Sequence, residues 1–247
     1  MPSVKKQAPR LFVLTGAGIS AESGIATFRA SDGLWEQHRI EDVASPEGFK
    51  RDPELVQRFY NMRRAGIQDP KIAPNDAHRA LVELERRWPG EFLLVTQNVD
   101  NLHERAGSRK LLHMHGELLK VRCQSSDQVY VWNGEITSAT KCECCQVTGT
   151  LRPHIVWFGE MPMHMDEIFE FLDACDLFIS VGTSGVVYLA AGFVAHAKGR
   201  GRARSIEVNL EPTPLTTMFD EQLAGPATKT LPGLVTRLLA EYGPRKN

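Results

Sequence analysis

Short apolar runs alternate with helix-like segments along this chain, and this alternation constrains its fold more than any other feature. The runs that predict strands are Leu11–Leu14, Phe92–Thr96, Leu111–Met114, Leu177–Val181 and Ser205–Leu210. The segments that predict helices are Pro74–Trp88, Asp166–Cys175, Val186–Lys198 and Pro232–Tyr242. Fully apolar strands separated by helices favour a parallel sheet covered on both faces. We therefore expect an α/β fold built on a Rossmann-like open parallel sheet.

Two segments break this alternation and predict a second, smaller unit. Arg29–Arg64 has the pattern of a long loop followed by a helix from about Pro53, and Arg122–Leu151 is rich in Cys, Gly, Ser and Thr. We interpret both as insertions that pack together as a small domain. Residues 35–75 form a helical module and residues 117–154 a cysteine module in this interpretation. The Rossmann-like domain then comprises residues 1–34, 76–116 and 155–247.

Composition and charge exclude several protein classes. Hydrophobic residues make up 42% of the 247 residues, which is typical of globular proteins rather than disordered or fibrous ones. The net charge of −1 offers no general attraction to nucleic acid or to anionic lipid, so we expect neither partner. The uncharged stretch Leu177–Ala195 contains Gly182-Thr183-Ser184-Gly185, which indicates a turn rather than a membrane span. The apolar run after Arg10 is too short for a secretory signal, so we expect a cytoplasmic protein with reduced or metal-bound cysteines.

The first predicted strand runs directly into Gly16-Ala17-Gly18-Ile19-Ser20-Ala21, which fits the pattern G-x-G-x-x-(G/A). Glycines in this pattern let backbone N–H groups approach a pyrophosphate, although a glycine turn after a strand is as often only a turn. A standard dinucleotide domain continues with a second strand and an acidic residue about 20 positions later. Residues Trp35 to Arg39 show no strand pattern. The sequence disfavours an ordinary dehydrogenase, but not a nicotinamide dinucleotide as ligand.

Polar residues collect where further predicted strands end, which is where open α/β sheets bind ligands. From about Leu11 to Ala227 the chain resembles the sirtuin family of NAD-dependent protein-lysine deacylases, and within it the bacterial CobB-type, class III branch. Besides the glycine loop, the blocks that carry this resemblance are Thr96–His103, His113–Gly116, Ile155–Glu160, Gly182–Ser184 and Asn209–Glu211.

The resemblance implies a site for NAD, which this family consumes as a co-substrate. It makes His115 the catalytic base and gives Asn98 the task of orienting the ribose and a water. His113 is the rival base, but the glycine after His115 matches the family's H-G block. An imidazole titrates near neutral pH, which suits either assignment. The implied NAD-binding residues are Gly16, Ala17, Gly18, Ser20, Ala21, Thr27, Phe28, Arg29, Trp35, Gln97, Asn98, Val99, Asp100, Gly182, Thr183, Ser184, Asn209, Leu210, Glu211 and Ala227.

The implied reaction removes acyl groups from protein lysines and yields nicotinamide and O-acyl-ADP-ribose. The acyl-lysine protein would bind as an extended peptide between Val156–Glu160 and Gly185–Tyr188, by adding a strand. Class III members use a Y-x-x-R pair for the carboxylate of succinyl-, malonyl- or glutaryl-lysine, and Tyr60 with Arg63 matches it at i, i+3. We therefore expect activity on acetyl and acidic acyl groups, from a monomer or weak oligomer. The substrate residues are Tyr60, Arg63, Val156, Trp157, Phe158, Gly159, Gly185 and Val186.

Four cysteines predict one structural zinc ion. Cys142-x-x-Cys145 has the spacing of a zinc-ligand pair, but Cys123 has Ser126 where the family often has its second cysteine. Cys144 fills the gap, or the site is labile or empty, or the four are free thiols.

Two other functions compete with the deacylase. A mono-ADP-ribosyltransferase on the same fold has no distinguishing sequence feature. A non-enzymatic zinc adaptor for nucleic acid or chromatin requires a basic patch near the cysteines. There the acidic residues Asp127, Glu135 and Glu143 balance Arg122 and Lys141, which disfavours the adaptor.

Overall fold

The computed structural model describes residues 9–27, 34–35, 38–187, 189–201 and 203–243. It confirms the α/β prediction, with a six-stranded sheet in which every neighbouring pair of strands is parallel. In spatial order the strands are β11 (Glu221–Ala224), β10 (Arg204–Asn209), β9 (Leu177–Val181), β1 (Leu11–Thr15), β4 (Phe92–Thr96) and β5 (Leu111–His113).

The chain crosses this sheet in both directions from β1. Later strands add on one side as β4 and β5, and on the other side as β9, β10 and β11. The order therefore reverses between β1 and β9, which makes this the switch point where such sheets bind ligands. The register pairs Thr15 with Val181, so both strands end at the same level.

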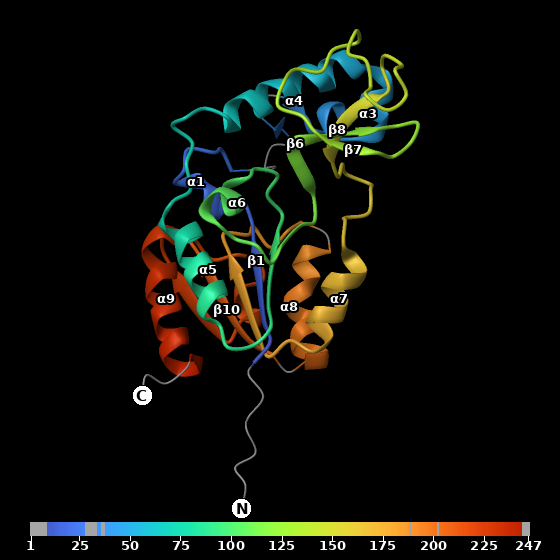
Figure 1. Cartoon of the computed structure of the whole chain (residues 1–247). Coiled ribbons are helices and arrows are strands. Elements are labelled where there is room, and N and C mark those ends of the chain that lie inside the picture. The colour runs from blue at the N-terminus through green and yellow to red at the C-terminus, as the bar shows by residue number, and fades with distance from the viewer. Residues whose placement is uncertain (1–8, 28–33, 36–37, 188, 202, 244–247) are drawn as a thin grey trace, which may run out of the picture.

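Helices cover both faces of the sheet, as predicted (Figure 1). Residues Leu11 and Val13 of β1 pack into the core under α5 (Asp76–Arg87) and α9 (Ala227–Tyr242). Their neighbours Phe12 and Leu14 pack into the core under α7 (Met165–Asp173) and α8 (Phe193–His196). Successive side chains of a strand point to opposite faces, so two buried faces require an unbroken apolar run.

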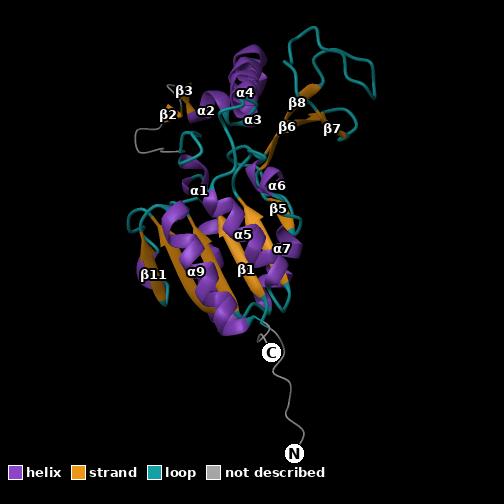
Figure 2. Ribbon diagram, turned by 60° about the vertical axis from the view of Figure 1, so that its left-hand side comes forward, coloured by secondary structure: helices purple, strands orange, loops and turns teal. Residues whose placement is uncertain are grey.

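A second group of elements lies beyond one end of the large sheet (Figures 1 and 2). It contains a three-stranded antiparallel sheet in the order β7-β6-β8. Its elements are β2 (Leu34–Trp35), β3 (His38–Arg39), α2 (Ile40–Val43), α3 (Pro46–Arg51), α4 (Pro53–Ile67), β6 (Gly116–Cys123), β7 (Val129–Val131) and β8 (Leu151–Ile155).

One face of α4 carries a polar stripe, formed by Gln57, Asn61, Arg64 and Gln68 at spacings of three and four residues. Each side chain donates to a backbone carbonyl of the cysteine module. The acceptors, in the same order, are Leu151, Ile136, Leu118 and Asn133, at 2.8, 2.8, 2.9 and 3.0 Å. The helical and cysteine modules are therefore joined through polar side chains and main chain.

Some predicted elements were wrong. Leu34–Trp35 pairs with His38–Arg39 as a short hairpin, and α2 and α3 occupy much of the expected loop before α4. The predicted helix Val186–Lys198 is replaced by a 3₁₀ turn over Ala190–Gly192, then α8, then a π-helical turn over Ala197–Gly201. Leu189 adopts a left-handed φ of 67°, which prevents a helix from running through it.

Other elements differ at their ends or were not predicted. Helix α9 begins at Ala227 and contains Pro232, where the predicted helix was to start. Helix α5 begins after Asn75, whose side chain caps it as predicted. The elements without a specific prediction include α1 (Gly18–Ala21), α6 (Leu102–Ala106), β6, β7, β8 and β11. Over the described residues, no helix combines the length and the apolar character needed to cross a membrane.

Candidate active site

The loops that follow β1 and β9 interlock at the switch point through glycines. Gly18 N donates to Gly182 O at 2.9 Å, and Gly16 N donates to Val181 O at 3.0 Å. A Cβ on Gly18 would lie 2.6 Å from Gly182 Cα, and one on Gly16 would lie 2.8 Å from Gly182 O. Gly182 itself has a φ of 62°. Only glycine fits this crossing, and it leaves bare backbone of the kind that receives a pyrophosphate.

Three predicted NAD-binding residues form one buried hydrogen-bonded cluster beside this crossing. Asn98 Nδ2 donates to Ser20 Oγ at 3.1 Å, and Ser20 Oγ donates to Asp100 Oδ2 at 3.1 Å. Burial raises the pKa of Asp100, although the N–H of Leu102 and the Ser20 hydroxyl oppose that change. The cluster joins α1 to the loop after β4 and fixes the orientation of the Asn98 amide.

His115 lies beyond β5 and reaches back to the same loop. Its Nδ1 is 3.2 Å from the carbonyl oxygen of Gln97. A carbonyl can only accept, so Nδ1 carries the hydrogen and the neutral ring presents Nε2 as a base. Burial lowers the pKa of His115, which keeps the ring neutral near pH 7. The geometry suits general-base chemistry.

His113 lacks a free ring nitrogen for that role. Its Nδ1 lies 3.0 Å from the Asn98 carbonyl oxygen, and its Nε2 lies 2.7 Å from Glu104 Oε1. Burial would lower the pKa of His113, but the hydrogen bond and charge of Glu104 outweigh it and raise that pKa. With both nitrogens engaged and only 7% of the residue exposed, His113 is less suited than His115 to act as the base.

A buried series of hydrogen bonds between polar side chains behind Asn98 was not predicted from the sequence. Thr15 Oγ1 donates to Thr96 Oγ1 at 2.8 Å and accepts from His103 Nε2 at 3.0 Å. Thr96 Oγ1 also accepts from the backbone N–H of Asn98 at 3.0 Å. Strand-end threonines and a histidine on α6 are the signal that was available. These three side chains support the loop rather than lining the site, since all three are buried.

The remaining predicted NAD residues lie in different surroundings. Asn209 Nδ2 donates to Thr183 O at 2.7 Å, which joins the loops after β9 and β10. Ser184, Leu210 and Glu211 are exposed. Thr27 and Val99 are partly buried, Ala21 is exposed, and Ala227 is buried at the start of α9. Phe28, Arg29 and Tyr188 lie outside the described residues, as does the side chain of Trp35.

The predicted acyl-binding pair lies one helical turn apart on α4. Tyr60 is completely buried, and its hydroxyl oxygen accepts from Trp157 Nε1 at 3.0 Å. Burial raises the pKa of Tyr60, so its hydroxyl keeps its hydrogen. Arg63 is partly buried, with Cζ 5.6 Å from the centroid of the Phe59 ring.

The predicted peptide-binding residues follow β8 and β9. Phe158 and Val186 are 50% and 66% exposed, as side chains that contact a partner would be. Val156 N donates to His115 O at 2.9 Å, which places this strip next to the proposed base. Gly159 and Gly185 both have left-handed φ values, at 90° and 70°.

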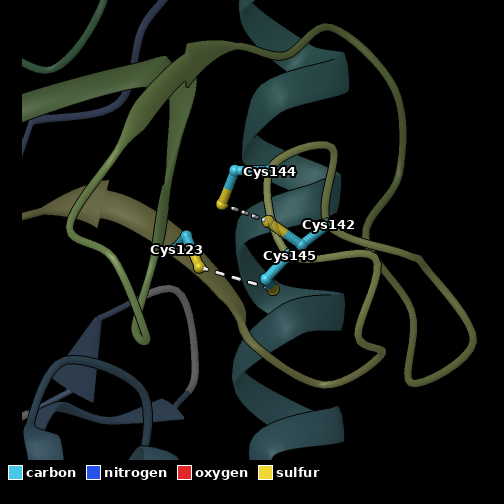
Figure 3. Close-up of side chains that lie close together, drawn as sticks. All are labelled: Cys123, Cys142, Cys144 and Cys145. Atoms are coloured by element: carbon cyan, nitrogen blue, oxygen red, sulfur yellow. Dashed lines mark hydrogen bonds between the residues drawn. The ribbon is translucent and has the colours of Figure 1, made fainter.

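The four predicted metal-binding cysteines converge on one point (Figure 3). The sulfur atoms of Cys123, Cys142, Cys144 and Cys145 all lie within 4.8 Å of one another. A tetrahedral ion with Zn–S bonds of ~2.3 Å requires sulfurs about 3.8 Å apart, and Cys123 and Cys145 are at 3.9 Å. Ser126 Oγ lies 3.1 Å from Cys144 Sγ and the Ser126 hydroxyl lowers the pKa of Cys123. Four converging thiols are a donor set that fits a zinc ion.

The chain is similar to proteins of one family over most of its length. The profile of the Sir2 family matches residues 16–189. An NAD-dependent protein deacylase of Escherichia coli (strain K12) is 60% identical over 233 residues, which cover 94% of this chain and 83% of that protein.

Solved structures are similar as well. A Sir2 homologue in complex with NAD has a TM-score of 0.84 at 42% identity, and the match covers 95% of this chain and 91% of that chain. A Sir2 protein bound to an acetylated peptide has a TM-score of 0.76 at 28% identity, with 94% and 92% covered.

Proposed function

The chain belongs to the Sir2 family, and from this premise we propose that it is an NAD-dependent protein-lysine deacylase. Its proposed substrates are acetyl-lysine and lysines with acidic acyl groups such as succinyl and malonyl. The observation that carries the proposal is the meeting of a glycine crossing, an oriented Asn98 amide and a neutral His115 at one end of the sheet. A named deacylase at 60% identity supports the same reaction class.

In this proposal, NAD supplies the ribose carbon that receives the acyl oxygen, with nicotinamide as the leaving group. The backbone at Gly16, Gly18 and Gly182 holds its phosphates, and Asn209 its adenosine side. The Asn98 amide, held by Ser20, orients the nicotinamide ribose and a water. His115 Nε2 takes a proton from a ribose hydroxyl, while the Gln97 carbonyl keeps Nδ1 protonated.

The proposed activity on acidic acyl groups rests on Tyr60 and Arg63. Moving a carboxylate out of water is costly unless charge-assisted hydrogen bonds replace its hydration. Arg63 supplies a permanent positive charge one helical turn from the Tyr60 hydroxyl. Acetyl-lysine has no carboxylate and therefore does not need this pair.

Zinc has a structural role in this proposal. The cysteine cluster lies in a module joined to α4 by the polar stripe, and the proposed base belongs to the other end of β6. We also propose the domain division given above for residues 35–75 and 117–154. Five free thiols, four of them in a metal-type cluster, support a cytoplasmic location.

The decisive assay measures nicotinamide release from NAD with acetyl-lysine and succinyl-lysine peptides in parallel. Mass spectrometry of the products separates the proposal from its nearest rival. O-acyl-ADP-ribose with free lysine supports deacylation. ADP-ribose attached to protein, without loss of the acyl group, would replace the proposal with a mono-ADP-ribosyltransferase.

A further inference from the structure

The contact between Trp157 and Tyr60 has a fixed direction. An indole N–H can only donate, whereas a phenol carries one hydrogen and acceptor lone pairs. At 3.0 Å the Trp157 Nε1–H must donate to the Tyr60 oxygen, so the Tyr60 hydrogen points elsewhere. Among the described residues, none accepts a hydrogen bond from the Tyr60 hydroxyl.

Within the described part of the chain, the Tyr60 hydroxyl is therefore a donor without an acceptor. Tyr60 is 0% exposed and Trp157 is 2% exposed, so bulk solvent supplies no acceptor, and an acceptor has to come from a substrate whose entry opens the site. A buried unsatisfied polar group destabilises a protein by about 1–3 kcal/mol, which a ligand acceptor would recover. Accepting from the indole also polarises the phenol and strengthens its O–H as a donor.

Trp157 is held firmly enough to impose this direction. The Arg152 guanidinium stacks on the indole, with Cζ 3.5 Å from the ring centroid. Arg152 also forms a two-point ion pair with Glu160, at 2.7 and 3.0 Å, and Glu160 Oε2 accepts from the Trp157 backbone N–H at 2.8 Å. Phe49 packs against the indole as well, at 5.2 Å between centroids.

We infer that Trp157 is a positioning residue that sets acyl specificity. Its indole N–H donates to the lone pairs of the Tyr60 oxygen. The Tyr60 O–H therefore remains available to donate a hydrogen bond to an acyl chain whose end can accept one. A succinyl or malonyl carboxylate can accept it, and an acetyl methyl group cannot. This inference rests on the proposed function, because it explains a preference of the same site.

The test replaces Trp157 with Phe, which retains an aromatic ring for Arg152 but removes the N–H donor. The measured quantity is the ratio of kcat/KM for succinyl-lysine to kcat/KM for acetyl-lysine peptide. We expect this ratio to fall about three- to tenfold, the range of one neutral hydrogen bond, through a higher KM for the succinyl peptide. An equal fall in both activities, or an unchanged ratio, would overturn the inference.

Two further variants separate positioning from structural damage. Trp88→Phe is the matched control, because the Trp88 N–H donates to Pro9 O at 2.8 Å at the far end of the sheet. It is expected to leave the ratio unchanged, and a lowered ratio would overturn the inference by showing that general loss of stability changes selectivity. In a Tyr60→Phe background, Trp157→Phe should change the ratio no further. If it keeps its full effect there, it does not act through the hydroxyl, and the inference fails.

The parent enzyme distinguishes this failure from that of the proposed function. If the parent releases nicotinamide with acetyl-lysine but not with succinyl-lysine peptide, the proposed activity on acidic acyl groups is itself wrong, and the inference falls with it. If the parent acts on both peptides and Trp157→Phe keeps their ratio, the inference alone is wrong.

Discussion

His113 and Glu104 form an ion pair whose geometry requires a doubly protonated imidazole. His113 Nε2 lies 2.7 Å from a Glu104 carboxylate oxygen, and Nδ1 lies 3.0 Å from the Asn98 carbonyl oxygen. Both partners only accept, so both ring nitrogens must carry hydrogen. The imidazolium ties α6 and β5 to the loop that holds Asn98.

This pair predicts a pH-dependent contribution to stability, tested with Glu104→Gln. The pKa of His113 is raised above 6.5, so its contribution is complete below that value and is lost as pH rises through the folded-state pKa. The pKa of Glu104, which burial would raise, is lowered below 4.5 by the His113 hydrogen bond, so its contribution is lost as pH falls through the folded-state pKa. Between pH 5 and 6.5 we expect the free energy of unfolding of the variant to be about 1 kcal/mol lower than that of the parent. The loss is this small because Glu104 is 40% exposed and solvent screens its charge.

Urea unfolding at pH 6 and at pH 9 measures this loss. The matched control is Glu83→Gln, which breaks an exposed pair with Arg87 and should change little at either pH. An equal loss at both pH values would contradict the ionic account of the His113–Glu104 pair.

His115→Tyr is expected to abolish turnover while NAD still binds, because the base acts after the co-substrate is in place. In the parent, kcat/KM should fall as the pH is lowered, and the midpoint of this fall should lie below pH 6.5, because burial lowers the pKa of His115. Calorimetry with NAD and a nicotinamide-release assay give the two readouts. Turnover above a few per cent of the parent rate would show that His115 is not the base.

Arg63→Met should separate the two deacylase activities. Methionine keeps much of the length of arginine but offers neither charge nor donor. Loss of a charge-assisted bond typically costs about 1.5–3 kcal/mol, so desuccinylation should fall at least about tenfold in kcat/KM against a few-fold change in deacetylation. Arg58→Met, exposed on the same helix, is the control. An equal reduction of both activities would make Arg63 a structural residue of α4.

Gly18→Ala should weaken NAD binding and destabilise the fold, because the new Cβ would meet the backbone of Gly182 at 2.6 Å. Neither strand end can move without disturbing β1 or β9. Gly66→Ala on α4 is the opposite case, with no atom within 4 Å of its Cβ, and should stabilise by about 0.5–1 kcal/mol. Thermal unfolding with and without NAD compares them. Normal NAD affinity in Gly18→Ala would exclude close packing at this crossing.

Freshly purified protein should carry up to one zinc ion, measured by elemental analysis. Cys142→Ser should lower both the zinc content and the unfolding temperature, because Cys142 lies in the buried core of the cysteine module. Cys175→Ala, outside the cluster, should keep the zinc content. Well under half an equivalent of zinc in parent protein that was never chelated would argue against a structural site.

The parallel sheet was predictable because its strands are buried on both faces and read as unbroken apolar runs, as at Leu11–Thr15. The small elements were not. The hairpin of β2 and β3 has only two residues per strand, too few for any period to emerge. Leu189 interrupts an otherwise helical pattern through its backbone conformation, which its residue type does not indicate.

The members of the site were predictable from their residue types and from their positions at strand ends, but the contacts between them were not. Ser20, Asn98 and Asp100 were predicted separately, and the structure brings them together. The contact of His103 with Thr15 could not be predicted, because 88 residues separate the two in the sequence. The Trp157–Tyr60 contact spans 97 residues, so its direction becomes apparent only once the fold is known. The individual roles of these residues remain predictions.

The polar stripe of α4 also dictates an order of events during synthesis. Gln57 emerges from the ribosome 94 residues before its acceptor Leu151, an interval of roughly 5–20 s at ordinary translation rates. Throughout that interval the apolar side of α4, with Phe59 and Tyr60, lacks Trp157, which belongs to the same hydrophobic cluster in the folded protein. The nascent chain therefore presents an amphipathic helix that only the earlier members of its cluster, such as Val43 and Phe49, can cover. Such segments are what chaperones bind and what drives early aggregation, so the yield of folded protein depends on how α4 is sheltered until β8 arrives.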